Sequence, residues 1–410
     1  MGNLMTCKIN ADTTNGLKLI SDTSGAVDIQ SNGTTKVTID ANGNINTVGQ
    51  VSTTDNGTIV TRQNAKPLII NGDMQVAQRA TSLTGYTGPG PFTTVDRYRL
   101  DISSLGTHTV AQTASAPDDT GLVNSFRIDC TTADASPGAS DFMILSTRLE
   151  GQDVQLFKKG TSYAEKMTVS FWVKSNKTGT YIVEIDDNDN GRNINQAYTI
   201  SSANTWEKKV LSFAGDTTGA FGNDNGDSFR LLWWLGAGSN FTSGSLQTAW
   251  AATDNTKRAV GQVNIADSTD NDWSITGIQL EVGEYNSTTI PAFQHESFGD
   301  NLARCQRYHF TTGDRSGYMF GRGWNNSTTE VFRWGFMLPV EMRAAPTNAI
   351  SGTVGLWNGA VAGSASLGTS YNTPHAVQID LGSGGTLNNI PGGIGMMYLN
   401  TGRFSATAEL

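Results

Sequence analysis

The feature that most constrains the fold is a pattern of short alternating apolar runs, each closed by a Gly, Asn or Asp turn, that fills residues 67–296. In the run 166–175, apolar residues alternate with Ser170, Trp172 and Lys174, so one face of a strand would enter a core while the other faces outward. The pattern predicts a two-sheet β-sandwich of jelly-roll type. The predicted strands are 96–102, 124–130, 141–149, 166–175, 180–186, 205–213, 227–236 and 272–282.

Residues 17–46 have thinner strands and predict a small β-meander. Three short alternating runs are separated by Ser-Gly and Asn-Gly pairs, which supply the positive φ that tight hairpins need. So small a meander buries little apolar surface alone. It is therefore expected to associate with its own copies, as a stalk or adaptor in a homotrimer. The runs are Leu17/Leu19, Val27/Ile29 and Val37/Ile39.

The rest of the chain divides at a linker and at a helix. Residues 47–66 are polar and a proline follows, which predicts a linker or a loosely paired ribbon. The segment 297–310 is the best helix candidate, because Ser297 can cap it and Asp300 follows three residues later. The expected domains are an N-terminal attachment and oligomerisation meander at 1–63, the sandwich at 64–296, and the short helix with a C-terminal β-domain at 297–410.

The C-terminal β-domain is predicted from strand-like runs at 329–342 and 374–382. The edges of such strands must be paired or covered, and a homotrimer does both. We therefore expect the aromatic side chains of Phe332, Trp334 and Phe336 to be divided between the domain core and subunit contacts.

Charge and cysteine content narrow the classes of partner. The chain has 28 Lys and Arg against 37 Asp and Glu, a net charge of −9 without a basic cluster, so nucleic acid is not an expected partner. The longest apolar cluster, 229–238, is too short to span a bilayer, which predicts no membrane insertion. Cys7, Cys130 and Cys305 lack a Cys-x-x-Cys spacing, so we expect no disulfide framework and folding in a reducing cytoplasm.

A series of stretches, running in order along most of the chain, carries a family resemblance. They are IINGDMQVAQRAT, TVDRYRL, VSFWVKS, TWEKKVLSF, GNDNGDSFRLLWWLGAGS, ITGIQLEVG, PAFQHESFGDNLARCQRY and LPVEMRAAPT. Together they closely resemble a family of bacteriophage virion proteins, the tail-fibre-like and capsid-appendage proteins common in marine phages. The leader NGLKLISDTSGAVDIQSNGTTKVTIDANGNI also resembles the repeated leader segments of that family.

The resemblance implies a middle region similar to the jelly-roll fold of carbohydrate-binding modules, with LIINGDMQ as its opening strand. It also implies a virion protein, made in the bacterial cytoplasm, whose N-terminal region attaches to other proteins of the tail or the capsid. The expected function is adhesion to host-surface polysaccharide. Two alternatives stay open: a head-fibre or capsid decoration protein with a structural role and, less favoured, a polysaccharide depolymerase.

The sequence contains no recognised catalytic motif. Its four histidines, His108, His295, His309 and His375, have no metal-ligand spacing, and no nucleophile elbow, Walker loop or dinucleotide fingerprint occurs. His295 and Glu296 are adjacent in a predicted loop, where neighbouring side chains point apart. Glycoside hydrolysis needs two carboxylates, which a chain with 37 acidic residues always offers, so their presence carries no weight. We expect no enzyme activity.

The stretch DDNDNG, residues 186–191, matches the front of a calcium-binding loop. Asp186, Asn188 and Asn190 offer oxygen ligands at alternate positions, but an alanine stands where the later acidic ligand is expected. An Asn/Asp/Gly hairpin turn explains the same residues, as it explains GNDNGD at 222–227. The family resemblance implies that a structural calcium is common in such modules. No other cofactor is expected.

Tryptophans beside basic residues are the candidate ligand-binding groups. Flat rings stack on sugar faces, and a few polar groups fix the orientation of the ligand. Trp172 shares a strand face with Lys174, and Trp234 shares one with Arg230, so these four residues are the candidate glycan-binding site. The alternative is that a loop or a neighbouring subunit covers both tryptophans, since tryptophan is usually mostly buried.

Overall fold

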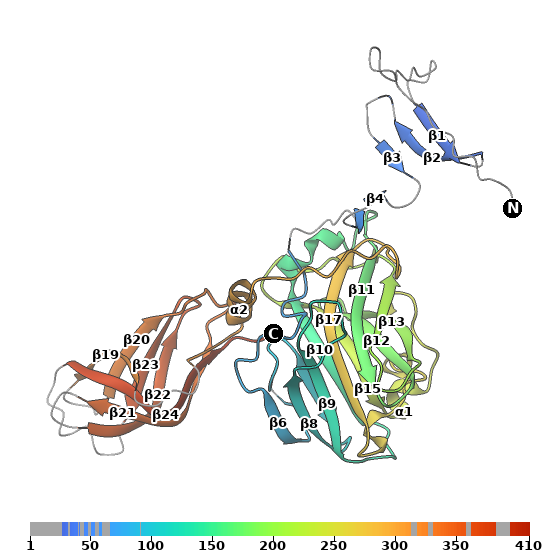
Figure 1. Ribbon diagram of the computed structural model, residues 1–410. Coiled ribbons are helices and arrows are strands. Elements are labelled where there is room, and N and C mark those ends of the chain that lie inside the picture. The colour runs from blue at the N-terminus through green and yellow to red at the C-terminus, as the bar shows by residue number, and fades with distance from the viewer. Residues whose placement is uncertain are drawn as a thin grey trace. The chain divides into compact units, whose positions relative to one another are not determined.

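The computed structural model is built from antiparallel strands in every sheet, which confirms the predicted all-β class (Figure 1). The chain forms two compact units, residues 1–61 and residues 62–410. The described residues are 27–31, 33–39, 41, 45–47, 51–53, 57–59, 66–90, 92–312, 318–326, 331–357, 362–382 and 394–410.

The first unit contains the predicted meander. Its sheet has the order β1-β2-β3, and a separate hairpin pairs β4 with β5 inside the stretch predicted as a linker or ribbon. Gly33 turns the first hairpin with a φ of 73°, which glycine adopts without strain. Ile29 stays 51% exposed, and the predicted run at Leu17 and Leu19 lies outside the described residues. The strands are β1 (Val27–Ser31), β2 (Thr34–Ile39), β3 (Ile45–Thr47), β4 (Val51–Thr53) and β5 (Gly57–Ile59).

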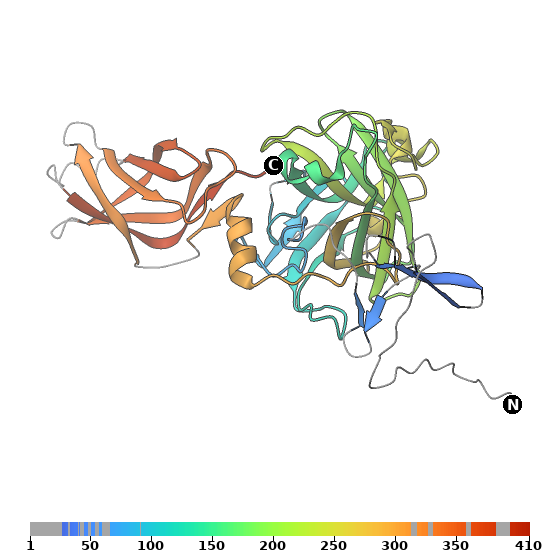
Figure 2. The same ribbon diagram turned by 90° about the horizontal axis from the view of Figure 1, so that it is seen from above.

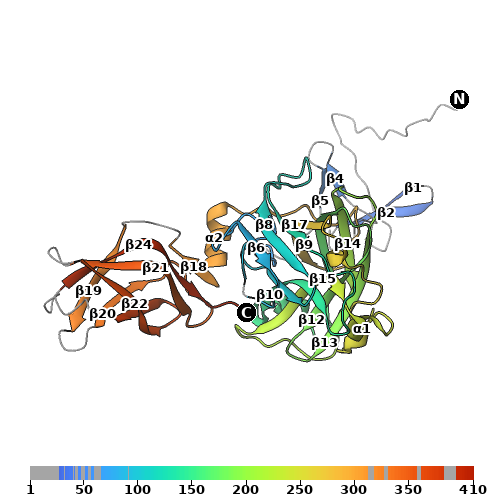
Figure 3. The same ribbon diagram turned by 90° about the horizontal axis from the view of Figure 1, so that it is seen from below.

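The second unit begins with a sandwich of two six-stranded antiparallel sheets (Figures 1 and 3). The β12 sheet has the order β16-β13-β12-β15-β10-β7, and the β11 sheet has the order β14-β11-β17-β9-β8-β6. All eight predicted strands are present, and β6, β8, β13 and β16 are additional. The strands are β6 (Ser82–Tyr86), β7 (Arg99–Ser103), β8 (Thr107–Thr113), β9 (Ser125–Thr132), β10 (Phe142–Glu150), β11 (Met167–Ser175), β12 (Gly179–Asp187), β13 (Arg192–Ile200), β14 (Glu207–Phe213), β15 (Asp227–Ala237), β16 (Ala251–Ala252) and β17 (Asp272–Val282).

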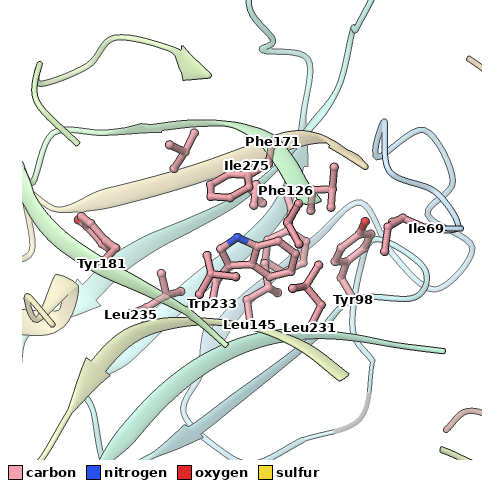
Figure 4. Packing of buried hydrophobic residues seen from close by; sticks show 14 of the residues in the cluster. Ile69, Tyr98, Phe126, Leu145, Phe171, Tyr181, Leu231, Trp233, Leu235 and Ile275 are labelled. Carbon is pink, nitrogen blue, oxygen red and sulfur yellow. The ribbon is translucent and has the colours of Figure 1, made fainter. Parts of the chain in front are cut away.

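The core lies between the inner faces of these two sheets. Phe171 of β11 and Trp233 of β15 are both fully buried and meet edge to face, with ring centroids 5.7 Å apart (Figure 4). Val169 and Val173 are equally buried on the same face of β11, which confirms the predicted alternation of that strand. Short helical turns lie in the connections: η1 (Gly151–Asp153), η2 (Gln155–Phe157), α1 (Ser239–Thr242), η3 (Asn255–Lys257) and η4 (Ile265–Asp267).

The expected opening strand LIINGDMQ is wrong, because residues 68–73 form turns. Asn71 takes a left-handed φ of 58°, and its side-chain amide donates to the carbonyls of Val76 and Asp96 at 2.9 and 3.0 Å. These bonds hold the backbone in a loop conformation that is incompatible with a strand paired in a sheet. A Cβ on Gly72 would lie 2.2 Å from the carbonyl oxygen of Ile278, so this loop packs against β17 where only glycine fits.

The predicted helix is present as α2 (Phe298–Gln306), the orange coil in Figure 2. Its cap is the one expected: the Ser297 hydroxyl accepts from the Asp300 backbone amide at 3.2 Å and donates to the Asp300 carboxylate at 2.6 Å. At nine residues it is too short to span a bilayer, and no other helix in the described part of the chain is long and apolar enough to do so. Cys130 and Cys305 are buried free thiols, and Cys7 is not among the described residues.

Seven further strands form a C-terminal sheet with the order β18-β24-β19-β20-β23-β22-β21, which an additional β24–β21 pairing closes. Both edges of β20 are paired inside the chain, with β19 and with β23, so the expectation that a second subunit covers these edges is wrong for this strand. Phe336 is half-buried and meets Phe404 edge to face at 5.3 Å, whereas the side chains of Phe332 and Trp334 lie outside the described part of the structure. The strands are β18 (His309–Thr311), β19 (Tyr318–Asn326), β20 (Val331–Met337), β21 (Thr347–Trp357), β22 (Ala362–Asn372), β23 (Ala376–Gly382) and β24 (Ile394–Thr407).

A buried ionic network ties α2 to the sandwich. Glu150, at the end of β10, is fully buried and accepts two hydrogen bonds of 2.7 Å from the Arg307 guanidinium and one of 2.7 Å from the Tyr308 hydroxyl. Burial alone would raise the pKa of Glu150, but these hydrogen bonds outweigh it and hold that pKa below its usual value. The residues that follow α2 are therefore fixed to the end of a core strand.

A second ion pair brings the end of β24 back to the same place. Arg97 is 1% exposed, pairs with Glu409 and lies over the Tyr308 ring, 3.4 Å from its centroid. Arg79 donates to the other oxygen of Glu409 at 2.9 Å. Residues 408–410 thus return from the C-terminal sheet to pack beside α2 and the opening loop of the sandwich.

Candidate functional site

Two of the four predicted site residues lie on the outward face of the β11 sheet. Trp172 and Lys174 are half-buried on β11, on the face away from the core. Lys208 of β14 pairs directly opposite Trp172, and the Lys174 amine lies 5.1 Å from the ring centroid of Trp206, just before β14. We call Trp172, Lys174, Trp206 and Lys208 the tryptophan–lysine surface. Its two indoles and two amines alternate across a pair of neighbouring strands.

The segment 114–124 is attached to β11 and β17 by hydrogen bonds at both of its ends. The Lys174 amine donates to the Ser115 hydroxyl at 3.1 Å, and the Thr276 hydroxyl of β17 donates to the Asn124 carbonyl at 2.6 Å. Both bonds fix the segment to the sheet. Val123, near its end, is an exposed apolar side chain, 59% accessible.

A bulge in β17 makes room for the Trp172 ring. The β11–β17 register shifts between Ser170 and Trp172, opposite Gly277, which has a φ of 61°. A Cβ at Gly277 would lie 3.1 Å from Cδ1 of Trp172 and 2.7 Å from Cδ1 of Leu122. Glycine at this position therefore allows the Trp172 indole to lie close against the sheet, and this close packing restricts the orientation of the ring.

The other two predicted residues, Arg230 and Trp234, lie on the opposite side of the sandwich. They belong to β15, in the β12 sheet, so they face away from Trp172 and Lys174. The prediction that the four residues form one site is wrong for this reason. Alternation along a strand separates core-facing from outward-facing residues, but two strands of different sheets have outward faces that point in opposite directions.

Trp234 is also covered, as the alternative interpretation allowed. It is fully buried, its indole N–H donates to Glu184 at 2.7 Å, and the Phe241 ring of α1 lies 5.3 Å away. The Arg258 guanidinium lies over its face, 5.2 Å from the ring centroid. The segment 239–262 therefore occupies the position that a stacked sugar would need.

Ion pairs occupy the charged groups on the outward face of the β12 sheet. Arg230 pairs with Asp227 at 2.7 Å and with Asp186 at 3.5 Å, and Arg258 pairs with Glu184 at 2.7 Å. Burial, together with repulsion from Glu184, raises the pKa of Asp186 to about 6. These carboxylates are held by arginines, which suits a structural role for this face.

Two of the three calcium candidates, Asn188 and Asn190, lie in the hairpin turn that was the alternative interpretation, and Asp186 lies in β12. Residues 188–191 connect β12 to β13, and the Asn190 amide donates to both oxygens of Asp187 and to the Ala220 carbonyl. The Asn188 amide donates to the Asp227 carbonyl at 2.8 Å, while Asp186 faces Arg230. Among the described residues, no group of three or more His, Cys, Asp or Glu side chains is arranged to hold a metal ion.

The histidines are separate from one another and from these groups. His295 contacts the Thr120 carbonyl at 3.2 Å, whereas its neighbour Glu296 pairs with Arg304 at 2.6 Å, so the two side chains have different partners. His108 is buried and its pKa is lowered by desolvation. His309 is also buried, and desolvation lowers its pKa to about 2. Both are neutral at physiological pH and enclosed.

A second aromatic position escaped the sequence reasoning. Tyr163 is 78% exposed at the rim of a hollow of about 520 Å³ formed by residues 154–163 and 220–221. Lys159 also lines this hollow. Its side chain is fully buried and pairs with Asp187 and, at 3.1 Å, with Asp216. The sequence does contain a signal for this position. Tyr163 lies in the polar stretch KKGTSYAEK between two predicted strands, where its ring cannot enter the core.

No protein-family model and no curated protein matches this chain. Solved structures that match part of this chain include the enzymatically active domain of bacteriophage CBA120 tailspike protein 4, at 12% identity and a TM-score of 0.28. That match covers 53% of this chain and 21% of the tailspike chain, so this chain spans about a fifth of it.

Two further solved structures are single modules. A putative sugar binding protein from Bacteroides thetaiotaomicron VPI-5482 has 14% identity and a TM-score of 0.29, with 53% of this chain and 100% of that chain covered. The module TmCBM61 in complex with β-1,4-galactotriose has 9% identity and a TM-score of 0.25, with 53% and 99% covered. Scores this low do not identify a shared ligand or activity.

Proposed function

We propose that the sandwich binds polysaccharide at the tryptophan–lysine surface without cleaving it, and that the chain is a tail-fibre-like adhesive protein of a phage virion. The observation that carries the binding proposal is the pair of half-buried indoles, Trp172 and Trp206, on an outward sheet face beside two amines. Rings in this setting offer a flat apolar surface for a pyranose, and the amines offer donors for its oxygens.

A surface this shallow predicts weak binding per site. One face of a sheet encloses much less of a ligand than a cleft does, so affinity would come from several copies on one particle. The homotrimer expected from the N-terminal meander would supply three sites, and Ile29, exposed on β1, is an apolar residue available for such association. Light scattering of the purified chain tests that state directly.

Replacing Trp172 with alanine is expected to weaken binding to polysaccharide about tenfold, because the variant loses one stacking face. Since the ring lies outside the core, the variant should still fold. The measurement is affinity electrophoresis in gels containing host-surface polysaccharide, with thermal unfolding of the same preparations and an assay for released reducing sugar.

Tyr163→Ala is the matched control, since it removes the exposed ring at the rim of the hollow between η2 and Phe221 and leaves the tryptophan–lysine surface intact. Binding lost in Tyr163→Ala and kept in Trp172→Ala would move the site to that hollow. Equal mobility of wild type and both variants in every gel would leave a structural appendage as the function. Reducing sugar released by the wild type would overturn the non-enzymatic assignment.

The virion assignment rests on the sequence resemblance and has its own test. Gold-labelled antibody against residues 64–300 is expected to label intact virions at the tail. Label over the head would instead favour a head fibre or capsid decoration protein, and absence of label from purified virions would remove the assignment altogether. Neither result alters the binding test on the isolated chain.

A further inference from the structure

Lysine pairing in the sandwich singles out two residues. Eight lysines lie between residues 92 and 312, a stretch described without a gap. Six of them form an ion pair with a carboxylate of the chain, including residues as exposed as Lys158 with Glu165 and Lys166 with Glu284. The other four pairs are Lys159–Asp187, Lys177–Asp267, Lys209–Glu207 and Lys257–Asp254.

The two lysines of this stretch that have no carboxylate partner within the described structure are Lys174 and Lys208. Both belong to the tryptophan–lysine surface. The nearest acid along β14, Glu207, is engaged by Lys209 and by the backbone amides of Ser201 and Ser202. In a chain with a net charge of −9, two uncompensated ammonium groups therefore share one face with two indoles.

Neither amine is simply a fully hydrated surface charge. Lys208 is exposed at the surface, yet partial loss of hydration lowers the pKa of its amine. The Lys174 amine is directed toward the Ser115 hydroxyl and the Trp206 ring, which are neutral groups. An anion placed between the two amines would compensate charges that the protein itself leaves unpaired.

We propose that the tryptophan–lysine surface selects acidic polysaccharides, whose sugars carry carboxylate or sulfate groups. This inference rests on the proposed binding function and adds the class of ligand. Lys208 is opposite Trp172, and Lys174 is two positions further along β11, so the two lysines are diagonal neighbours with Cβ atoms about 7–8 Å apart. A polymer with a repeated anionic group can contact both amines while its sugar faces stack on the indoles.

The ligands for the test are paired so that each acidic polymer is compared with a neutral polymer of the same backbone. Polygalacturonate is compared with its methyl ester, and dextran sulfate with dextran, in affinity electrophoresis at about 0.15 M salt, where long-range attraction is screened. The wild-type chain is expected to bind at least one acidic member about tenfold more tightly than its neutral counterpart. Whether carboxylate or sulfate is preferred identifies the source of the anion, and either result supports the inference.

The variants test whether these two lysines are responsible. Lys174→Gln with Lys208→Gln is expected to lose about tenfold in affinity for the acidic ligand and clearly less for the neutral one, because the glutamine amides still donate to sugar oxygens but carry no charge. The control, Lys158→Gln with Lys166→Gln, changes the net charge by the same amount at two exposed, paired lysines, and should bind as the wild type does.

Four results would overturn the inference. Equal binding of neutral and acidic members, lost in Trp172→Ala, would leave the proposed function standing and remove the charge selectivity. Equal losses in both double variants would show a general charge effect, and so would binding of single-stranded DNA as tight as that of the acidic glycan. Absence of binding to any of the four polymers would remove the proposed function together with this inference.

Discussion

Lys159→Met is expected to destabilise the sandwich by about 3–5 kcal/mol, the range for breaking a buried ion pair by removing one partner. The Lys159 side chain is fully buried, and Asp187, its closest partner, is equally enclosed. Methionine keeps most of the volume but leaves the Asp187 carboxylate with only the Asn190 amides. Urea unfolding monitored by tryptophan fluorescence measures the loss.

Lys158→Met is the control, one residue earlier in the chain. Lys158 is 51% exposed and pairs with Glu165, which is 29% exposed, so water replaces the lost contact and the cost should stay below about 1 kcal/mol. Adding Asp187→Asn to Lys159→Met should recover part of the loss, because it removes the orphaned charge. An equal free energy of unfolding for the two single variants would show that burial of an ion pair does not determine how much it contributes to stability.

Glu150→Ala is expected to loosen the attachment of α2, at a cost of about 3 kcal/mol. The change removes four hydrogen bonds that converge on one carboxylate, two from Arg307, one from Tyr308 and one from Gln152. Arg307 is 29% exposed and can be rehydrated, but the Tyr308 side chain is fully buried and its hydroxyl loses its acceptor. Hydrogen exchange of residues 298–311 should accelerate while that of β11 and β15 stays slow.

The control is Glu284→Ala, which removes a carboxylate that is 62% exposed and pairs with Lys166. Its effect on exchange at α2 should be negligible and its effect on stability less than about 1 kcal/mol. Uniformly faster exchange throughout the sandwich in Glu150→Ala would contradict a role confined to the attachment of α2, and would place Glu150 in the global stability of the core.

Strands could be predicted where one face enters the apolar core, as in β11 and β15. The missed strand β13 shows the limit of that signal, because its outward face carries Asn193 and Asn195, both fully buried. Gln247 bonds to each of them, through its own amide to the Asn193 side chain and through its carbonyl to the Asn195 backbone. Buried amides that bond to a distant loop look, in the sequence, like an exposed polar run.

The candidate site was predicted in part. The direction of Trp172 and Trp234 follows from alternation, and both do face away from the core. What covers an outward face depends on long connections such as 239–262, whose path has no periodic signal. Trp206 was missed for a related reason: it becomes a neighbour of Lys174 only through the β11–β14 register, which pairs residues about 35 positions apart.

The return of residues 408–410 to the sandwich has a consequence for how the chain folds. Arg97 and Glu409 are 312 positions apart, so the guanidinium has no access to this partner until nearly the whole C-terminal sheet has been synthesised. Closing so long a loop is slow, and domains generally fold in the order of their synthesis. On the ribosome, the sandwich would therefore form first with the Arg97 guanidinium still unpaired. The ion pair with Glu409 would form afterwards, once the C-terminal sheet has folded.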